Sequence, residues 1–178
     1  MPSIFGKVNM VFFTSDTHFG HKNIIRFCNR PFKSLDHMHT VLTNNWNSRV
    51  KPRDTVIIVG DFAFRNKKKY YWYSDQLNGE KIFVQGNHDK NNAIKTHITS
   101  LVMKLLKKDI FVTHRPSDIV FGYDLYLVGH VHEKWKHKIV NDGERNNILI
   151  NVGVDVWNFM PVKIDEIMHY VKVYSLSI

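Results

Sequence analysis

The chain repeats one local pattern, in which a short apolar run ends abruptly in polar residues. Such runs are typical of buried strands, and they break where the strand meets its loop. The polar residues that follow successive runs are Asp16 and His18, then Asp61, then Asn87 and His88, then His114, and finally His130 and His132. Because ligands bind at the carboxyl ends of strands in open α/β sheets, we expect these side chains to converge on one crevice.

The first half of the chain alternates strand and helix patterns. Apolar runs at 10–15, 55–59 and 81–85 are predicted strands, and residues 34–50 place apolar side chains at helical spacing behind a capping serine. Residues 67–77 also have a helical pattern. Strands separated by helices favour βαβαβ units and a parallel sheet.

From about residue 100 the predicted strands become short and closely spaced, which favours an antiparallel or mixed sheet packed on the first. The ranges are 101–103, 109–113, 125–128 and 148–152 for the strands, 164–170 for a late helix and 171–174 for a final strand. No internal repeat or linker divides the sequence, so we expect residues 1–178 to form a single α/β domain with two sheets.

The composition excludes several classes of protein. With 178 residues, 43% of them hydrophobic and 23% charged, the chain is neither a disordered segment nor a low-complexity fibre. No apolar stretch approaches the roughly 18 residues of a spanning helix, and no secretory signal is visible. The single cysteine, Cys28, cannot form an internal disulfide, so we expect a cytoplasmic protein. A net charge of +9 favours anionic partners: phosphorylated molecules, nucleic acid or acidic membrane surfaces.

The polar residues and the glycines beside them fall into an ordered set of motifs. The motifs are Asp16-Thr17-His18, Gly60-Asp61, Gly86-Asn87-His88-Asp89, the isolated His114, and Gly129-His130-Val131-His132. In this order they resemble the full signature of the calcineurin-like metallophosphoesterases. The stretches 16–23 and 151–157 look like those of small stand-alone bacterial and phage-type members. The resemblance implies an α/β fold, a four-layer α-β-β-α sandwich of two mixed sheets.

The resemblance also implies a site for two divalent transition-metal ions that share one carboxylate. By motif position, the first ion would be bound by Asp16, His18, Asp61 and His132. The second would be bound by Asp61, Asn87, His114 and His130, which makes Asp61 the bridge. Imidazole and oxygen ligands without thiolate suit Mn, Fe, Zn or Ni, and Mn is the expected ion.

The same resemblance implies the chemistry. A metal-bound hydroxide would attack phosphorus at the dinuclear site, since a metal lowers the pKa of bound water to about 7. His88 would act as general acid or charge stabiliser beside the leaving group, and Asp89 would orient the His88 ring.

Three further residues are predicted to bind the substrate. His21 and Arg26 follow the first motif, where the amides at the start of a helix would help to hold phosphate. The alternative is that His21 caps a turn and Arg26 is solvated. Arg115 follows His114 and would clamp phosphate oxygens, unless it pairs with an acidic neighbour.

Other conspicuous residues have plainer interpretations. Asp155 is interpreted as a turn cap rather than a partner of the site, and Cys28 as an inert small hydrophobe. Residues 67–69 are lysines and 70–73 are aromatic, which is typical of a helix with its rings facing the core; a nucleic-acid platform is the alternative. The remaining histidines are expected to be surface or hydrogen-bonded residues: His37, His39, His97, His137 and His169.

The sequence thus predicts a metal-dependent phosphoesterase. A phosphodiester is favoured because so short a chain leaves no room for a large capping domain and should keep an open cleft. A phosphorylated small molecule or nucleotide is the expected partner. Three alternatives stay open: a nuclease acting on DNA or RNA, a phosphomonoesterase, and a non-catalytic metal-binding scaffold for protein or nucleic acid.

Overall fold

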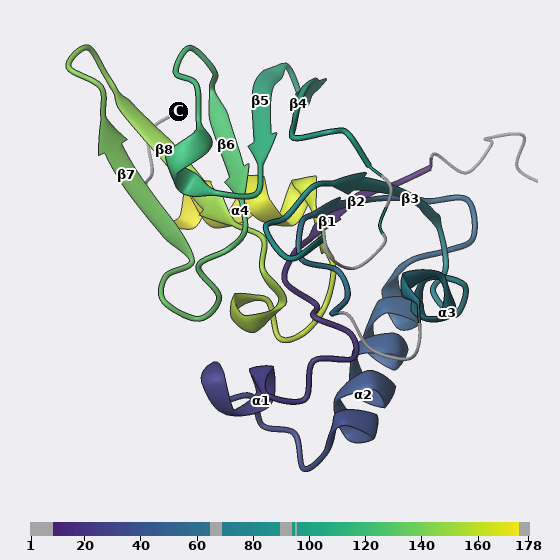
Figure 1. Cartoon of the computed structure of the whole chain (residues 1–178). Coiled ribbons are helices and arrows are strands. Elements are labelled where there is room, and N and C mark those ends of the chain that lie inside the picture. Colours follow the sequence, from purple (N-terminus) through teal and green to yellow (C-terminus); the bar gives the residue numbers. More distant parts are fainter. Residues whose placement is uncertain (1–8, 65–68, 90–93, 95, 175–178) are drawn as a thin grey trace, which may run out of the picture.

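Two mixed sheets form the framework of the computed structural model (Figure 1). The structure describes residues 9–64, 69–89, 94 and 96–174. The first sheet has the order β3-β2-β1-β9 and consists of β1 (Val11–Thr14), β2 (Thr55–Val59), β3 (Glu80–Val84) and β9 (Val162–Lys163). The three long strands are parallel, as predicted, and the short β9 pairs antiparallel with β1.

The second sheet has the order β4-β5-β6-β8-β7. Its strands are β4 (Ser100–Leu105), β5 (Lys108–Thr113), β6 (Leu125–Val128), β7 (His137–Asn141) and β8 (Asn146–Asn151). The central strands β5, β6 and β8 are parallel, whereas β4 and β7 pair antiparallel at the two edges. Strand β7 was not among the predicted strands, because a half-exposed edge strand carries no continuous apolar run.

The helices are short except for α2 and α4. The α-helices are α1 (Ile24–Phe27), α2 (Leu35–Arg49), α3 (Tyr70–Ser74) and α4 (Ile164–Val173), and the 3-10 helices are η2 (Pro116–Asp118) and η3 (Val154–Val156). Helix α2 begins as predicted, since the Ser34 side chain accepts a hydrogen bond from the His37 amide at 3.1 Å. Of the helix predicted over 67–77, residues 67 and 68 lie outside the described residues.

The predicted final strand at 171–174 is wrong. Helix α4 continues to Val173, and its side chains Ile164, Ile167 and Val171 are buried against the first sheet and the inner face of the second. These positions recur at helical spacing, and their burial overrides the local preference of Val171 and Val173 for strand. In the described part of the chain, no helix is long and apolar enough to cross a membrane.

The core is layered. Phe12, Val56 and Ile58 point from the first sheet toward α2 and α3, whereas the alternate residues Phe13 and Ile57 point toward the second sheet. Figure 1 shows α2 and α3 on the side of the first sheet away from the second. The outer face of the second sheet is covered by loop side chains, among them those of Tyr123 and Trp135. The arrangement confirms the predicted α/β sandwich of two mixed sheets.

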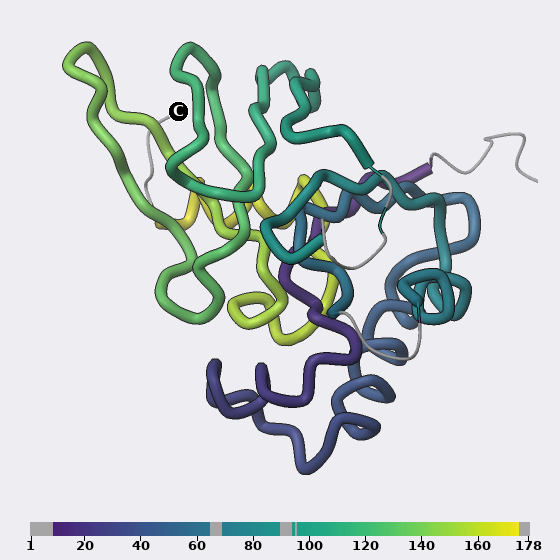
Figure 2. The backbone as a smooth tube through the Cα atoms, viewed as in Figure 1, coloured from purple at the N-terminus to yellow at the C-terminus, as the bar shows by residue number. Residues whose placement is uncertain are grey.

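The polar ends of the strands meet where the two sheets adjoin. Beyond β1, Ser15 forms a bridge with Gly153, and the Val154 amide donates to the Ser15 carbonyl at 3.1 Å. Figure 2 shows these two segments passing one another below the strands, next to the loop that follows β6. Three loops far apart in the sequence therefore enclose one site.

Candidate metal centre

The loops after β1 and β2 continue to pair beyond the strands, and this pairing places two aspartates side by side. The Asp16 amide donates to the Gly60 carbonyl at 3.1 Å, and the His18 amide donates to the Asp61 carbonyl at 3.1 Å. The Ser15 hydroxyl also donates to the Val59 carbonyl at 2.6 Å. Asp16 and Asp61 are thus fixed by backbone contacts, independently of their side chains.

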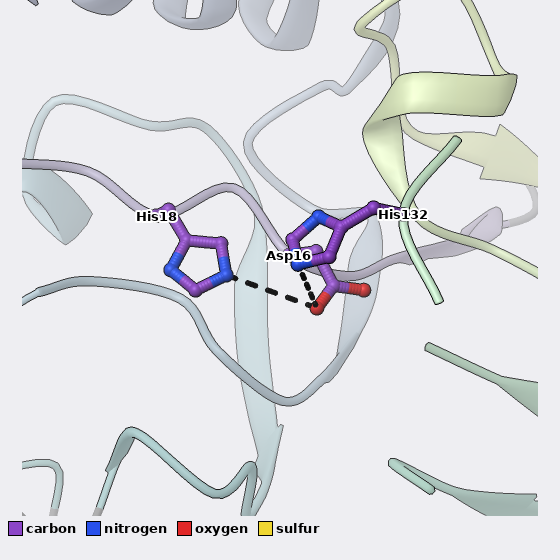
Figure 3. Close-up of side chains that lie close together, drawn as sticks. All are labelled: Asp16, His18 and His132. Carbon is purple, nitrogen blue, oxygen red and sulfur yellow. Dashed lines mark ion pairs between the residues drawn. The ribbon is translucent and has the colours of Figure 1, made fainter. Parts of the chain in front are cut away.

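The first group of predicted ligands surrounds the Asp16 carboxylate (Figure 3). Its Oδ1 atom lies 3.9 Å from His18 Nε2 and 3.9 Å from His132 Nε2. The rings of His18 and His132 stack with centroids 5.1 Å apart. The other carboxylate oxygen, Oδ2, accepts a hydrogen bond from the His130 amide at 2.9 Å.

Several polar atoms in this group are buried without a hydrogen-bond partner among the described residues. They are Asp16 Oδ1 and both ring nitrogens of His18. Burial also lowers the pKa of His18 well below its usual value, so this imidazole is neutral. An unpaired buried polar atom is costly, and carboxylate oxygens and neutral imidazole nitrogens are both able to bind a metal ion. The donor set therefore fits a metal ion.

The second group surrounds Asp61. The Oδ2 atom of Asp61 lies 3.4 Å from His114 Nε2 and 3.7 Å from His18 Nε2, so one oxygen faces both groups. Asn87 Oδ1 lies 3.1 Å from His114 Nε2. His130 completes the group, since its ring nitrogen lies within 4.8 Å of ligand atoms of Asp61 and His114. The structure thus brings together every residue that the sequence predicts as a ligand.

Hydrogen bonds fix which nitrogen of two histidines points into the site. His114 Nδ1 lies 2.8 Å from the Val59 carbonyl, and His132 Nδ1 lies 3.1 Å from Asp155 Oδ2. In both rings Nδ1 is hydrogen-bonded to a group outside the candidate site, so Nε2 is the nitrogen that faces the carboxylates. Burial lowers the pKa of both rings, but the hydrogen bond to Asp61 raises that of His114 to about 9, and the hydrogen bond to Asp155 raises that of His132 to about 10. A metal ion has to displace these protons to bind.

The backbone at the site is strained. A positive φ is found at Asp16 (56°), His18 (51°), Asp61 (52°), His130 (71°) and His132 (49°). This region is unfavourable for residues other than glycine, and residues held in it cluster at functional sites. The neighbouring glycine Gly60, at φ 86°, is needed because a Cβ there would collide with the His114 ring.

His88 lies at the candidate site as expected, but Asp89 does not orient its ring as predicted. The His88 ring is at the mouth of the site, with a 44% exposed side chain and Nε2 4.0 Å from Asp61 Oδ2. Asp89 was expected to orient this ring, but its buried carboxylate accepts hydrogen bonds from the amides of Asp61 (2.8 Å), Phe62 (3.2 Å) and Gly86 (2.7 Å). Asp89 therefore positions the Asp61 loop rather than the His88 ring.

Asp155 is not a simple turn cap. Its carboxylate accepts hydrogen bonds from Arg30 Nε at 2.7 Å and Arg30 Nη2 at 2.9 Å, in addition to its contact with His132. Arg30 is buried and also donates to the Asp16 carbonyl at 2.6 Å and the Thr17 carbonyl at 3.1 Å. Arg30 was not predicted, because its partners are distant in the chain and no motif marks it.

Asn151 is a second residue that sequence reasoning missed. It is fully buried, and its Nδ2 atom donates to the carbonyls of His132 (2.7 Å) and Trp135 (2.9 Å). Its Oδ1 atom accepts from the Gly153 amide at 2.8 Å. Asn151 thus ties the His132 loop to the segment that carries Asp155.

The three predicted substrate-binding residues have different positions. The His21 ring is 5.4 Å from that of His18, and Arg115 is exposed beside His114 on the rim of a pocket of about 330 Å³ that Asn87 also lines. Arg26 is exposed, with its guanidinium 5.4 Å from the Phe27 ring, and no contact within the described residues joins it to the predicted ligands. Helix α1 spans only four residues.

The plainer interpretations have mixed outcomes. His39 accepts from the Gly20 amide at 2.8 Å and His137 Nδ1 lies 2.8 Å from the Tyr170 hydroxyl, as expected of structural histidines. Cys28 is buried, but its Sγ atom lies within 4.8 Å of ligand atoms of His132 and Asp155, so its surroundings are not purely apolar. In α3, Tyr73 faces the core, whereas Tyr71 and Trp72 are exposed.

Comparisons with known proteins identify the family. The chain matches the calcineurin-like phosphoesterase superfamily domain over residues 10–157. It is 34% identical over 168 residues to an uncharacterized protein of Methanocaldococcus jannaschii, covering 91% of each chain. It is 27% identical over 195 residues to the Gene 66 protein of Mycobacterium phage L5, covering 90% of this chain and 93% of that one. A protein of unknown function from Aquifex aeolicus has a similar crystal structure, with a TM-score of 0.70, 27% identity and coverage of 91% and 99%.

Proposed function

Because the chain belongs to the calcineurin-like phosphoesterase superfamily, we propose that it is a phosphodiesterase that works with two divalent metal ions. Membership makes it a metal-dependent hydrolase of the phosphoesterase class. The number of ions, their identity and the preference for diesters are the proposal.

One observation supports the proposal above all others: buried, unpartnered ligand atoms face one another across a shared carboxylate. Asp16 Oδ1 and the His18 nitrogens lack partners within the described part of the chain, and Asp61 Oδ2 faces both His18 and His114. On this proposal, one ion would be held by Asp16, His18, Asp61 and His132. The other would be held by Asp61, Asn87, His114 and His130.

The donor chemistry favours a transition metal. Imidazole nitrogens mixed with carboxylate and amide oxygens suit Mn, Fe, Zn or Ni, and we propose Mn²⁺ as the working ion. When bound, such ions supply a water nucleophile at neutral pH and stabilise the charge that develops on phosphate oxygens. Two divalent ions outweigh the charges of Asp16 and Asp61, and Asn87 adds an oxygen without a charge. The site therefore attracts a phosphate anion.

The chain's own residues would complete the reaction. His88 is exposed at the mouth, 4.0 Å from Asp61, and would donate a proton from Nε2 to the leaving oxygen. Arg115 lies beside His114 on the rim of the adjacent pocket, where its guanidinium would bind phosphate oxygens. Asp155 and Arg30 would keep His132 oriented, and Asp89 would keep Asp61 in place.

We propose that the substrate is a nucleotide-type diester, acted on in the cytoplasm. The net charge of +9 supports an anionic substrate, and the single cysteine suits a reducing compartment. A nuclease is the second candidate, supported by exposed Tyr71 and Trp72 beside Lys69, whose Nζ lies 5.9 Å from the Tyr71 ring.

The proposal is tested by stripping the protein with a chelator and measuring hydrolysis of bis-p-nitrophenyl phosphate before and after Mn²⁺ is restored. We expect activity only with metal, slower hydrolysis of p-nitrophenyl phosphate, and no activity in Asp61→Asn. Full activity of the stripped protein would overturn the proposal. Bound metal without hydrolysis of any diester would instead indicate a scaffold.

The same preparation separates the two substrate classes. Cyclic nucleotides and labelled oligonucleotides are compared at several salt concentrations. Faster turnover of oligonucleotides that falls steeply with salt would favour the nuclease, because contacts to several phosphates release counterions.

A further inference from the structure

Phe27, at the end of α1, is exposed in a way that packing does not explain. Its side chain is 58% exposed, whereas Ile24 at the start of the same helix is buried in the core. A single exposed apolar side chain is common on protein surfaces, so the meaning of Phe27 depends on the groups around it.

Two more rings connect Phe27 to the metal centre. The His21 ring lies 6.1 Å from the Phe27 ring and 5.4 Å from the ring of His18, one of the predicted ligands. His21 also stacks on Phe64, with centroids 4.0 Å apart and ring planes 11° apart. Phe64 in turn lies 6.0 Å from His88. We call His21, Phe27 and Phe64 the rim aromatics.

The charge around the rim aromatics suits a ligand that is both aromatic and anionic. The Arg26 guanidinium lies 5.4 Å from the Phe27 ring, so a cation and an aromatic face are presented together. The buried Nδ1 atom of His21 has no hydrogen-bond partner within the described residues. The rim thus offers stacking surface, an unused polar atom and a nearby positive charge.

We propose that the rim aromatics bind the nucleobase of a nucleotide whose phosphate occupies the metal centre. This inference rests on the proposed function and names the substrate class more narrowly. Phe27 supplies an open face for the base, and the stacked pair of His21 and Phe64 forms the wall beside it. Because Phe64 adjoins His88, the bound base belongs to the leaving nucleoside.

The test compares the binding of two probes that differ only in the base. AMP and ribose 5-phosphate are titrated by calorimetry into the Mn²⁺-loaded protein and into Phe27→Ala and Phe27→Trp. Stacking on one aromatic side chain corresponds to an affinity gain of roughly 5- to 150-fold, so AMP should bind the unaltered protein at least about fivefold more tightly. Phe27→Ala should lose this advantage and keep its affinity for ribose 5-phosphate, and Phe27→Trp should retain both.

Phe121→Ala is the matched control, because Phe121 is a 44% exposed aromatic residue whose ring lies near Tyr126, on the outer face of the second sheet. This variant should leave both affinities unchanged. Equal affinity of the unaltered protein for the two probes, or an AMP advantage that survives in Phe27→Ala, would overturn the inference.

The binding experiment can fail or succeed independently of the phosphodiesterase activity. If diesters are hydrolysed but AMP has no advantage, the base site is wrong and the phosphodiesterase stands. If AMP has the advantage but no diester is hydrolysed, the base site stands and the activity is wrong.

Discussion

The two ends of the first sheet each bury an aspartate, and they treat its carboxylate in opposite ways. Asp54, just before β2, is 5% exposed, and its two oxygens accept hydrogen bonds from the amides of Met10 (2.9 Å) and Lys51 (2.7 Å). Asp16, just after β1, is 0% exposed, but only its Oδ2 atom has a hydrogen-bond partner within the described residues.

The difference separates a structural carboxylate from a ligand. At Asp54 every oxygen is used to hold loops together, so the residue contributes to stability. At Asp16 one oxygen has no hydrogen-bond partner in the described chain and is free to bind a ligand such as a metal ion. The backbone of Asp16 also has a strained, positive φ. Substitution of Asp54 should therefore lower the stability of the protein and leave its activity unchanged. Substitution of Asp16 should abolish activity and leave stability nearly unchanged.

The largest expected effect is that of Asp16→Asn. The amide oxygen can still accept from the His130 amide, so the metal-free variant should melt within about 2 °C of the unaltered protein. Removing a residue that hydrogen-bonds to a metal ligand lowers metal affinity or activity by roughly 10- to 100-fold. Removing a ligand itself should therefore reduce kcat/KM by more than about 100-fold. Hydrolysis of bis-p-nitrophenyl phosphate and bound metal are the measurements. Activity above a tenth of the original would contradict the role of Asp16.

Asp155→Asn should have an intermediate effect. His132 loses its anionic partner, so we expect Mn²⁺ affinity to fall by roughly 10- to 100-fold. Activity should recover in large part at saturating Mn²⁺, because the ligand itself is unchanged. Activity titrated against Mn²⁺ concentration measures both effects. An unchanged Mn²⁺ dependence would show that Asp155 only supports the fold through Arg30.

Asp54→Asn tests the opposite end of the sheet. One of the two backbone amides loses its acceptor, which costs about 1–3 kcal/mol of unfolding free energy. For a chain of this length that is a fall in Tm of roughly 2–12 °C. Thermal unfolding should show this fall, whereas kcat/KM at 25 °C should be unchanged. Loss of activity in the folded variant would remove the contrast between the two ends.

The smallest effect is a pH dependence of the metal-free protein. The pKa of His114 is about 9 in the folded state and 6.5 as its ordinary value, so its protonated form favours folding. That stabilisation is fully present below pH 6.5 and is lost as pH rises through 9. We expect the Tm of the chelator-treated protein to fall by a few degrees, at least about 3 °C, over this range.

Mn²⁺ affinity should rise over the same pH range, because binding displaces the protons of His114 and His132. A His137→Gln control, remote from the site, should leave this trend unchanged. Mn²⁺ affinity that is constant with pH would mean that these two rings are not ligands.

The sequence predicted that the candidate ligands lie together because each of them closely follows the end of a strand. A strand and its loop are local features, and parallel strands bring their ends together, so Asp16 and Asp61 needed no tertiary information. The residues that hold the candidate ligands in place could be found only with tertiary information. Arg30 and Asp155 are 125 positions apart, and neither has a local signal that names the other.

The same distinction explains the errors in the fold and at Asp89. Val171 and Val173 favour strand locally, and only burial against the sheets reveals the helix. Asp89 follows His88 in sequence, yet its carboxylate turns inward to the Asp61 loop. The two residues are neighbours in the sequence, which suggested a contact between their side chains, but the backbone directs the Asp89 carboxylate away from the His88 ring.

Anomalous diffraction from crystals soaked in Mn²⁺ tests the central claim most directly. Two peaks are predicted, one against Asp16 and His18 and one against Asn87 and His114, with the Asp61 carboxylate between them. A single peak, or peaks away from Asp61, would contradict the two-ion account.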